Sequence, residues 1–161
     1  MKQIKLSKRL SVIAGLIDNG SSVADIGTDH GYLPVYLALA GKHKRIIAAD
    51  MSPLSLESAK RSAKTYNVTK QIEFFETPGL TGLTQKDVNT VVISGLGGET
   101  IIDILSDAPW TCNNGIKLIL QPQSKLDLLC RFLYQHEYNI MNIQSLYDNK
   151  KYTVITAIGE K

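Results

Sequence analysis

The stretch Val23-Ala24-Asp25-Ile26-Gly27-Thr28-Asp29-His30-Gly31-Tyr32-Leu33-Pro34 opens with a short apolar run, continues into a glycine-bearing turn and ends in residues suited to a helix. The apolar run is typical of a buried parallel strand, both faces of which are covered. Gly27 and Gly31 favour a tight turn at which the backbone can approach a ligand closely. In an open α/β sheet, the first turn from strand to helix is a usual ligand contact. The stretch therefore predicts a cofactor loop, with a plain turn as the alternative.

A carboxylate ends the next predicted strand, Arg45-Ile46-Ile47-Ala48-Ala49-Asp50. An acid at this distance from a glycine loop is how such folds hold the hydroxyl pair of a ribose. The dinucleotide fingerprint G-x-G-x-x-G is not met, because Asp29 and Tyr32 stand where its later glycines would be. An anionic Asp29 opposes a pyrophosphate but suits a sulfonium and an ammonium. This combination favours S-adenosylmethionine as the cofactor.

The composition indicates one globular domain that spans residues 1–161. Apolar residues make up 43% and charged residues 20% of the chain, as in ordinary folded proteins. Cys112 and Cys130 form no C-x-x-C motif and lie near no cluster of histidines, which predicts reduced thiols, a cytoplasmic protein and no metal. No apolar run approaches the length of a membrane span. We expect a monomer that does not bind membranes.

The amino-terminal segment is basic, since the first acidic residue is Asp18. Four basic residues precede it: Lys2, Lys5, Lys8 and Arg9. Such a cluster either contacts phosphates of a nucleic acid or forms a solvated helix face. Apolar residues recur at helical spacing in this segment and predict a helix at about 7–19 rather than a secretory signal.

The remaining sequence alternates between strand and helix patterns, which predicts a mostly parallel sheet with helices on both faces. Seven strands are expected, and those after the first are at 45–50, 72–75, 88–94, 116–120, 140–145 and 152–158. The last two form an antiparallel hairpin at the sheet edge, joined by the turn-like run Asp148-Asn149-Lys150-Lys151. Ser52 and Pro53 suit the N-cap and first position of a helix. A second glycine loop, Ser94-Gly95-Leu96-Gly97-Gly98, follows the fourth strand and suits the approach of a planar substrate.

These features resemble the class I methyltransferases that use S-adenosylmethionine, which have a Rossmann-like fold. Three stretches, Ala24–Pro34, Ser94–Gly98 and Leu120–Pro122, are similar to the motifs of the bacterial tRNA (adenine(22)-N1)-methyltransferases, in the same order along nearly the whole chain. The resemblance implies an enzyme that transfers a methyl group from S-adenosylmethionine to N1 of an adenine in tRNA, at position 22.

The resemblance also implies the site. It places the methyl donor on the first motif and Asp50, and the reacting base beside the second glycine loop. The expected donor-binding residues are Asp25, Gly27, Thr28, Asp29, His30, Gly31, Asp50, Met51, Pro78, Gly79, Ser94 and Gly95. The expected substrate-binding residues are Leu96, Gly97, Gly98, Gln121 and Pro122.

Asp29 and Tyr32 are the expected catalytic residues. Methylation of N1 places positive charge on the adenine ring, which a carboxylate at Asp29 would stabilise while accepting a bond from the exocyclic amine; the alternative is a helix N-cap. Tyr32 suits stacking or hydrogen bonding to a flipped base, or plain packing. His30 either lines the donor pocket or caps the turn.

The sequence departs from the family pattern at three places. Pro78-Gly79-Leu80 replaces a D-G-L in the loop after the third strand, which predicts a lower affinity for the donor. Leu96 replaces a methionine of similar volume, and we expect this change to cost little. Family members continue past the last strand into a helical, coiled-coil-like extension that helps to hold tRNA, and this sequence ends at Lys161, so we expect the extension to be absent. Two alternatives stay open: a methyltransferase for a small molecule, and a binding-only domain with a degenerate donor site.

Overall fold

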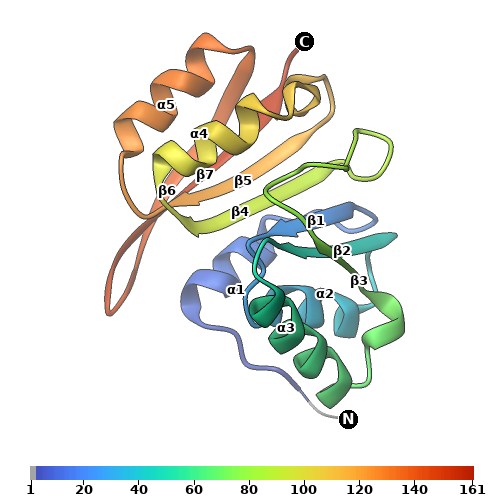
Figure 1. The fold of residues 1–161 in the computed structure, drawn as a ribbon. Helices are drawn as coiled ribbons and strands as arrows, with labels where there is room; N and C mark the ends of the chain where they lie inside the picture. Colours follow the sequence, from blue (N-terminus) through green and yellow to red (C-terminus); the bar gives the residue numbers. More distant parts are fainter. Residues whose placement is uncertain (1–2) are drawn as a thin grey trace.

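The computed structural model describes residues 3–161 and shows a single sheet with helices on both faces (Figure 1). Its seven strands run in the order β3-β2-β1-β4-β5-β7-β6. They are β1 (Ser22–Ile26), β2 (Arg45–Asp50), β3 (Glu73–Glu76), β4 (Thr90–Leu96), β5 (Lys117–Pro122), β6 (Tyr138–Asp148) and β7 (Lys150–Gly159). The first five are parallel and β7 is antiparallel to both of its neighbours. The predicted fold class is confirmed.

Helices α1 to α3 cover one face of the sheet, and α4 and α5 cover the other (Figure 1). The helices are α1 (Lys8–Gly15), α2 (Tyr32–Ala40), α3 (Pro53–Thr65), α4 (Gly98–Ser106) and α5 (Leu126–Gln135), with short 3-10 turns η1 (Thr69–Gln71) and η2 (Pro109–Cys112). The predicted cap of α3 is confirmed, because Ser52 accepts a hydrogen bond from the Ser55 amide at 3.2 Å and Pro53 begins the helix.

The order of the strands places two loops side by side. β1 pairs with β2 on one side and with β4 on the other, so the chain changes its direction of winding between β1 and β4. At such a switch point the loops after the two central strands diverge and leave a crevice. The loop after β1 begins at Gly27 and β4 ends at Leu96, so the two glycine stretches singled out in the sequence lie at this crevice.

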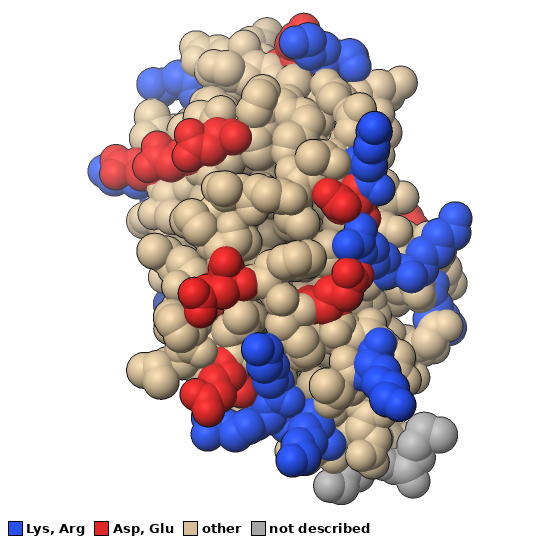
Figure 2. Space-filling model, turned by 45° about the vertical axis from the view of Figure 1, so that its right-hand side comes forward, with Lys and Arg blue, Asp and Glu red and all other residues tan. Residues whose placement is uncertain are grey.

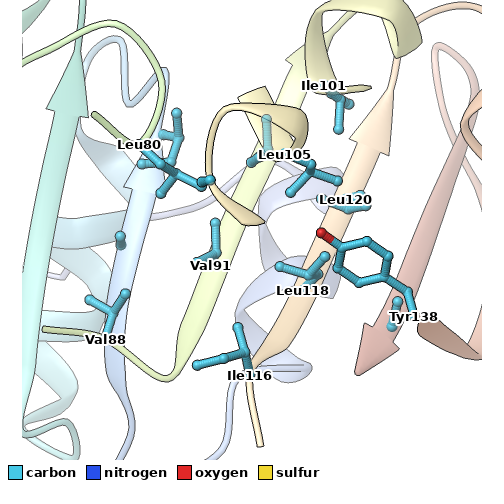
Figure 3. Packing of buried hydrophobic residues seen from close by; sticks show 14 of the residues in the cluster. Leu80, Val88, Val91, Ile101, Leu105, Ile116, Leu118, Leu120 and Tyr138 are labelled. Carbon is cyan, nitrogen blue, oxygen red and sulfur yellow. The ribbon is translucent and has the colours of Figure 1, made fainter. Parts of the chain in front are cut away.

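Each face of the sheet has its own apolar core. On one face, Ile101 and Leu105 of α4 pack over β-strand residues such as Leu118 and Leu120, all of them buried (Figure 3). The phenol of Tyr138 reaches this core with its hydroxyl paired to Thr111 Oγ1 at 2.7 Å, so this hydroxyl is buried with a partner. Full burial of each such apolar side chain stabilises the fold by about 2 kcal/mol. The two cores fix the strands that carry the crevice.

Several predicted boundaries are wrong. The fourth strand, predicted at 88–94, is β4 at 90–96, so Ser94, Gly95 and Leu96 of the predicted glycine loop belong to the strand. α1 is shorter than the predicted 7–19, because Ser7 caps it and the amides of Leu16 and Ile17 bond to the third residue before them, which tightens and ends the helix. The hairpin strands are longer than predicted. Asn149, with φ +64°, is the one residue between β6 and β7 and makes the turn that the sequence assigned to 148–151.

Candidate functional site

A cavity of about 870 Å³ opens at the carboxyl ends of the parallel strands, between the loops after β1, β2 and β4. Its size is that of a site for a cofactor or a small ligand. Most of the predicted site residues line it: Asp25, Gly27, Thr28, Asp29, His30, Tyr32, Asp50, Met51, Pro78, Ser94, Gly95 and Leu96. The others do not line it: Gly31, Gly79, Gly97, Gly98, Gln121 and Pro122.

Asp50 fixes the first glycine loop from the end of β2. Its Oδ2 accepts a hydrogen bond from the Asp29 amide at 3.1 Å, and its Oδ1 accepts one from the Ser52 amide at 2.9 Å. The amides of Gly27 and Thr28 both donate to the carbonyl of Ala49 at 2.9 and 3.0 Å. A carboxylate oxygen accepts more than one bond, so Asp50 keeps acceptor capacity toward the cavity.

Asp25 is a buried acid at the base of this loop, with 5% of its surface exposed. Thr28 Oγ1 donates to Asp25 Oδ2 at 2.9 Å. Burial raises the pKa of Asp25 to about 7, against the opposing effects of the Thr28 bond and of the nearby Arg9 charge. A cation that faces this carboxyl therefore favours its charged form.

Asp29 has a left-handed backbone, with φ +53°, and its side chain is two-thirds exposed at the cavity. The alternative in which Asp29 caps α2 is wrong, because Gly31 is the N-cap and no side chain bonds there. His30 does not cap the turn either: its Nδ1 lies 2.8 Å from Ser58 Oγ on α3, and its ring stacks on Tyr32 at 5.4 Å between centroids. Tyr32 is 46% exposed, so much of its ring is available to a ligand.

Gly31 lies beneath the cavity wall rather than in it. Its φ is +70°, and a Cβ atom there would lie 2.7 Å from the Ala59 Cβ and 3.0 Å from the Ala59 Cα. Real Cβ atoms essentially never approach so closely. This glycine lets the first loop rest directly on α3.

Gln121 organises the second glycine loop, where the sequence predicted a substrate contact. Gln121 is 1% exposed. Its Oε1 accepts hydrogen bonds from the Gly95 amide at 3.0 Å and from Arg9 Nη1 at 3.2 Å. Its Nε2 donates a hydrogen bond to the Pro122 carbonyl at 3.0 Å. Gly98 is buried against the turn after β5, since a Cβ atom there would lie 2.6 Å from the Ser124 carbonyl oxygen. Gln121 and Gly98 therefore fix the conformation of the second glycine loop through contacts inside the protein.

Arg9 is a site residue that the sequence analysis did not find. It reaches from α1 into the cavity, donates to Ser94 Oγ at 3.2 Å as well as to Gln121, and its charge lowers the pKa of Asp25. The sequence showed it only as one of several basic residues, with no spacing to set it apart. The lining residues Thr100, Asp103 and Asp107 of the α4 region were missed for the same reason.

The cavity wall is predominantly acidic. Five carboxylates line it, Asp25, Asp29, Asp50, Asp103 and Asp107, against the cations of Lys5 and Arg9. Such a wall favours a ligand that carries positive groups. Among residues 3–161, no three His, Cys, Asp or Glu side chains gather as metal ligands, and every helix is too short or too polar to cross a bilayer.

Known proteins resemble this chain in sequence over nearly its whole length. Residues 6–155 match the family model described as a methyltransferase domain. The tRNA (adenine(22)-N(1))-methyltransferase of Bacillus subtilis (strain 168) is 34% identical over 158 residues, which is 98% of this chain and 66% of that protein. This chain thus spans slightly less than two thirds of that relative's length.

Solved structures give the same neighbours. The crystal structure of the B. subtilis m1A22 tRNA methyltransferase has a TM-score of 0.91 at 32% identity, over 99% of this chain and 68% of that one. The M. capricolum enzyme, solved with S-adenosyl-homocysteine, has a TM-score of 0.84 at 31% identity, over 97% of this chain and 70% of that one. Both likenesses extend over the two glycine loops and the hairpin.

Proposed function

We propose that this chain, which belongs to the family of methyltransferase domains and within it to the tRNA (adenine(22)-N1)-methyltransferases, transfers the methyl group of S-adenosylmethionine to N1 of an adenine in tRNA. The observation that carries the proposal is the position of Asp50. Its carboxylate, fixed by two amides, lines an acidic cavity that Ser94 and Gly95 at the end of β4 also line.

The donor fits this wall by its charges and its shape. Asp50 accepts bonds from the two ribose hydroxyls, and the adenine of the donor lies toward Met51 and Pro78. Gly27 has φ +71° and no side chain of its own; a Cβ atom there would meet only Leu96, at 3.8 Å, so the donor can approach the backbone at this point. The ammonium of the donor is placed against Asp25, whose carboxyl ionises in response. Held by these residues, the donor would supply the reactive methyl group on its sulfonium.

The acceptor base enters between the two glycine loops. Methyl transfer is an in-line displacement, so alignment of the adenine N1 lone pair with the sulfur–methyl bond supplies much of the rate. Asp29 accepts a bond from the exocyclic amine and stabilises the positive charge that develops on the ring. The half-exposed ring of Tyr32 offers a face on which the extruded base stacks.

The substrate is proposed as tRNA because of the family and not because of the cavity, which would also admit a small acceptor. We also propose a cytoplasmic location, because tRNA is the proposed substrate; the free cysteines Cys112 and Cys130 agree with this proposal. We propose that this domain works as a monomer and without a metal. The first alternative, a small-molecule methyltransferase, predicts donor binding with no product on tRNA.

The test is methylation of a defined transcript. The chain is incubated with S-adenosylmethionine and an unmodified tRNA that carries adenine at position 22, and the digested nucleosides are analysed by mass spectrometry. 1-Methyladenosine should form, and a transcript with guanine at position 22 should give none. A chain that binds S-adenosylhomocysteine but methylates neither transcript would overturn the tRNA assignment and favour the small-molecule alternative.

A further inference from the structure

We infer that the tip of the β6–β7 hairpin, residues 147–152, is a docking arm for the RNA that carries the target adenine. This inference rests on the proposed function and adds to it a surface that lies outside the cavity. It is carried by the topology of the sheet, by the side chains at the tip and by their connection to the site.

The hairpin extends past the edge of the sheet at which the cavity opens. β7 pairs with β5 only up to Leu120, which faces Ile155, and β5 ends at Pro122. Because β7 is antiparallel to β5, the residues of β7 before Ile155 continue beyond the carboxyl end of β5. The paired register of β6 and β7 runs out to Asp148 and Lys150, about 10 Å beyond the end of β5. Figure 1 shows the hairpin projecting beyond the ends of β4 and β5, on the side of α1.

The side chains at the tip suit an RNA chain. Lys150 and Lys151 are exposed, and the ring of Tyr147, which pairs with Lys151 across the hairpin, is 70% exposed. Lysines at such a tip neutralise phosphates, and an exposed aromatic ring gives a stacking surface for an unpaired base. Asp148 is the one acid in the tip. The combination of paired cations and a free ring fits single-stranded or looped RNA better than a uniformly charged duplex.

The tip is connected to the second glycine loop through one arginine. The Tyr152 ring lies 5.2 Å from Lys150 Nζ and 5.7 Å from the Arg9 guanidinium carbon. Arg9 in turn donates to Ser94 Oγ and to Gln121 Oε1, each at 3.2 Å. RNA held at the tip therefore lies next to the segment that forms the acceptor side of the cavity.

The charge of the rest of the protein does not by itself provide a binding surface for RNA. The net charge of the chain is only +3, and on the face in Figure 2 Lys and Arg side chains lie interspersed with Asp and Glu. The cavity itself is lined by five carboxylates. An RNA backbone is repelled by that lining, so cations must hold it beside the cavity while one base enters.

The test replaces the two lysines of the tip together, K150A/K151A. The matched control is K42A/K44A, which removes the same charge from two exposed lysines in the segment before β2, a strand four places from β7 in the sheet. Binding of the unmodified tRNA transcript is followed by fluorescence anisotropy over a range of salt concentrations, and binding of S-adenosylhomocysteine by calorimetry. The KM for tRNA and kcat are measured with the same proteins.

The tip variant should bind tRNA about tenfold more weakly at low salt, with a salt slope smaller by one to two. Its KM for tRNA should rise while kcat and the affinity for S-adenosylhomocysteine stay at the level of the control. Equal tRNA affinity and salt slope in the two variants would overturn the docking arm and leave the proposed function standing. A parent chain that binds S-adenosylhomocysteine but no tRNA would overturn both.

Discussion

Replacement of Gly31 by alanine tests how the donor loop is supported. The backbone at Gly31 is left-handed, which costs an alanine about 1–2 kcal/mol. The new Cβ would also lie 2.7 Å from the Ala59 Cβ and 3.0 Å from its Cα, and overpacking of this kind costs about 1–3 kcal/mol. Gly31→Ala should therefore lower the free energy of unfolding by about 2–5 kcal/mol, a large share of the 5–15 kcal/mol that holds a domain folded.

Gly41→Ala is the matched control, because Gly41 has φ +66° but nothing within 4 Å of the new Cβ. It should cost only the backbone part, so in urea unfolding the Gly31 variant should have a midpoint about 1 M lower than the Gly41 variant. Ala59→Gly in the Gly31→Ala background should recover part of the loss despite the cost of a helical glycine. Equal midpoints for the two glycine variants, or purely additive effects at residues 31 and 59, would refute the close contact between loop and helix.

Three further predictions concern the charges of the site. The folded-state pKa of Asp25 lies near 7, above the ordinary 3.8, so the free energy of unfolding should fall as pH rises from about 4 to 7. Asp25→Asn should remove that fall. If urea unfolding gave the same pH dependence for the parent chain and the variant, this prediction would be contradicted. Arg9→Met removes the charge that favours ionised Asp25, so the same pH transition should move upward, and an unmoved transition would show that the two do not interact. Asp29→Asn should lower kcat at saturating S-adenosylmethionine by about 10²-fold or more, and unchanged turnover would remove Asp29 from the catalytic step.

The fold was predictable because the central strands are buried on both faces and read as continuous apolar runs. The run at 45–50, for example, matches β2 residue for residue. The ends of the elements were harder. Asn149 alone makes the hairpin turn, since its left-handed conformation permits a tighter connection than the polar run 148–151 indicated.

The cavity was predictable where glycines and acids follow strands, as at Gly27 and Asp50. It was not predictable where the contact depends on tertiary placement. Arg9 lies 85 residues from Ser94 along the chain, and only the packing of α1 brings them together. Gln121 shows the reverse error: it follows a strand near the site, yet its amide is used entirely within the protein.

The most direct test of the account is a calorimetric titration of the purified chain with S-adenosylhomocysteine, beside the Asp50→Ala variant. The parent chain should show saturable one-to-one binding. The variant should bind about 10- to 100-fold more weakly, because it loses charged hydrogen bonds to the ribose. No binding by the parent chain, or equal binding by the two proteins, would contradict the assignment of the Gly27 loop and Asp50 as the donor site.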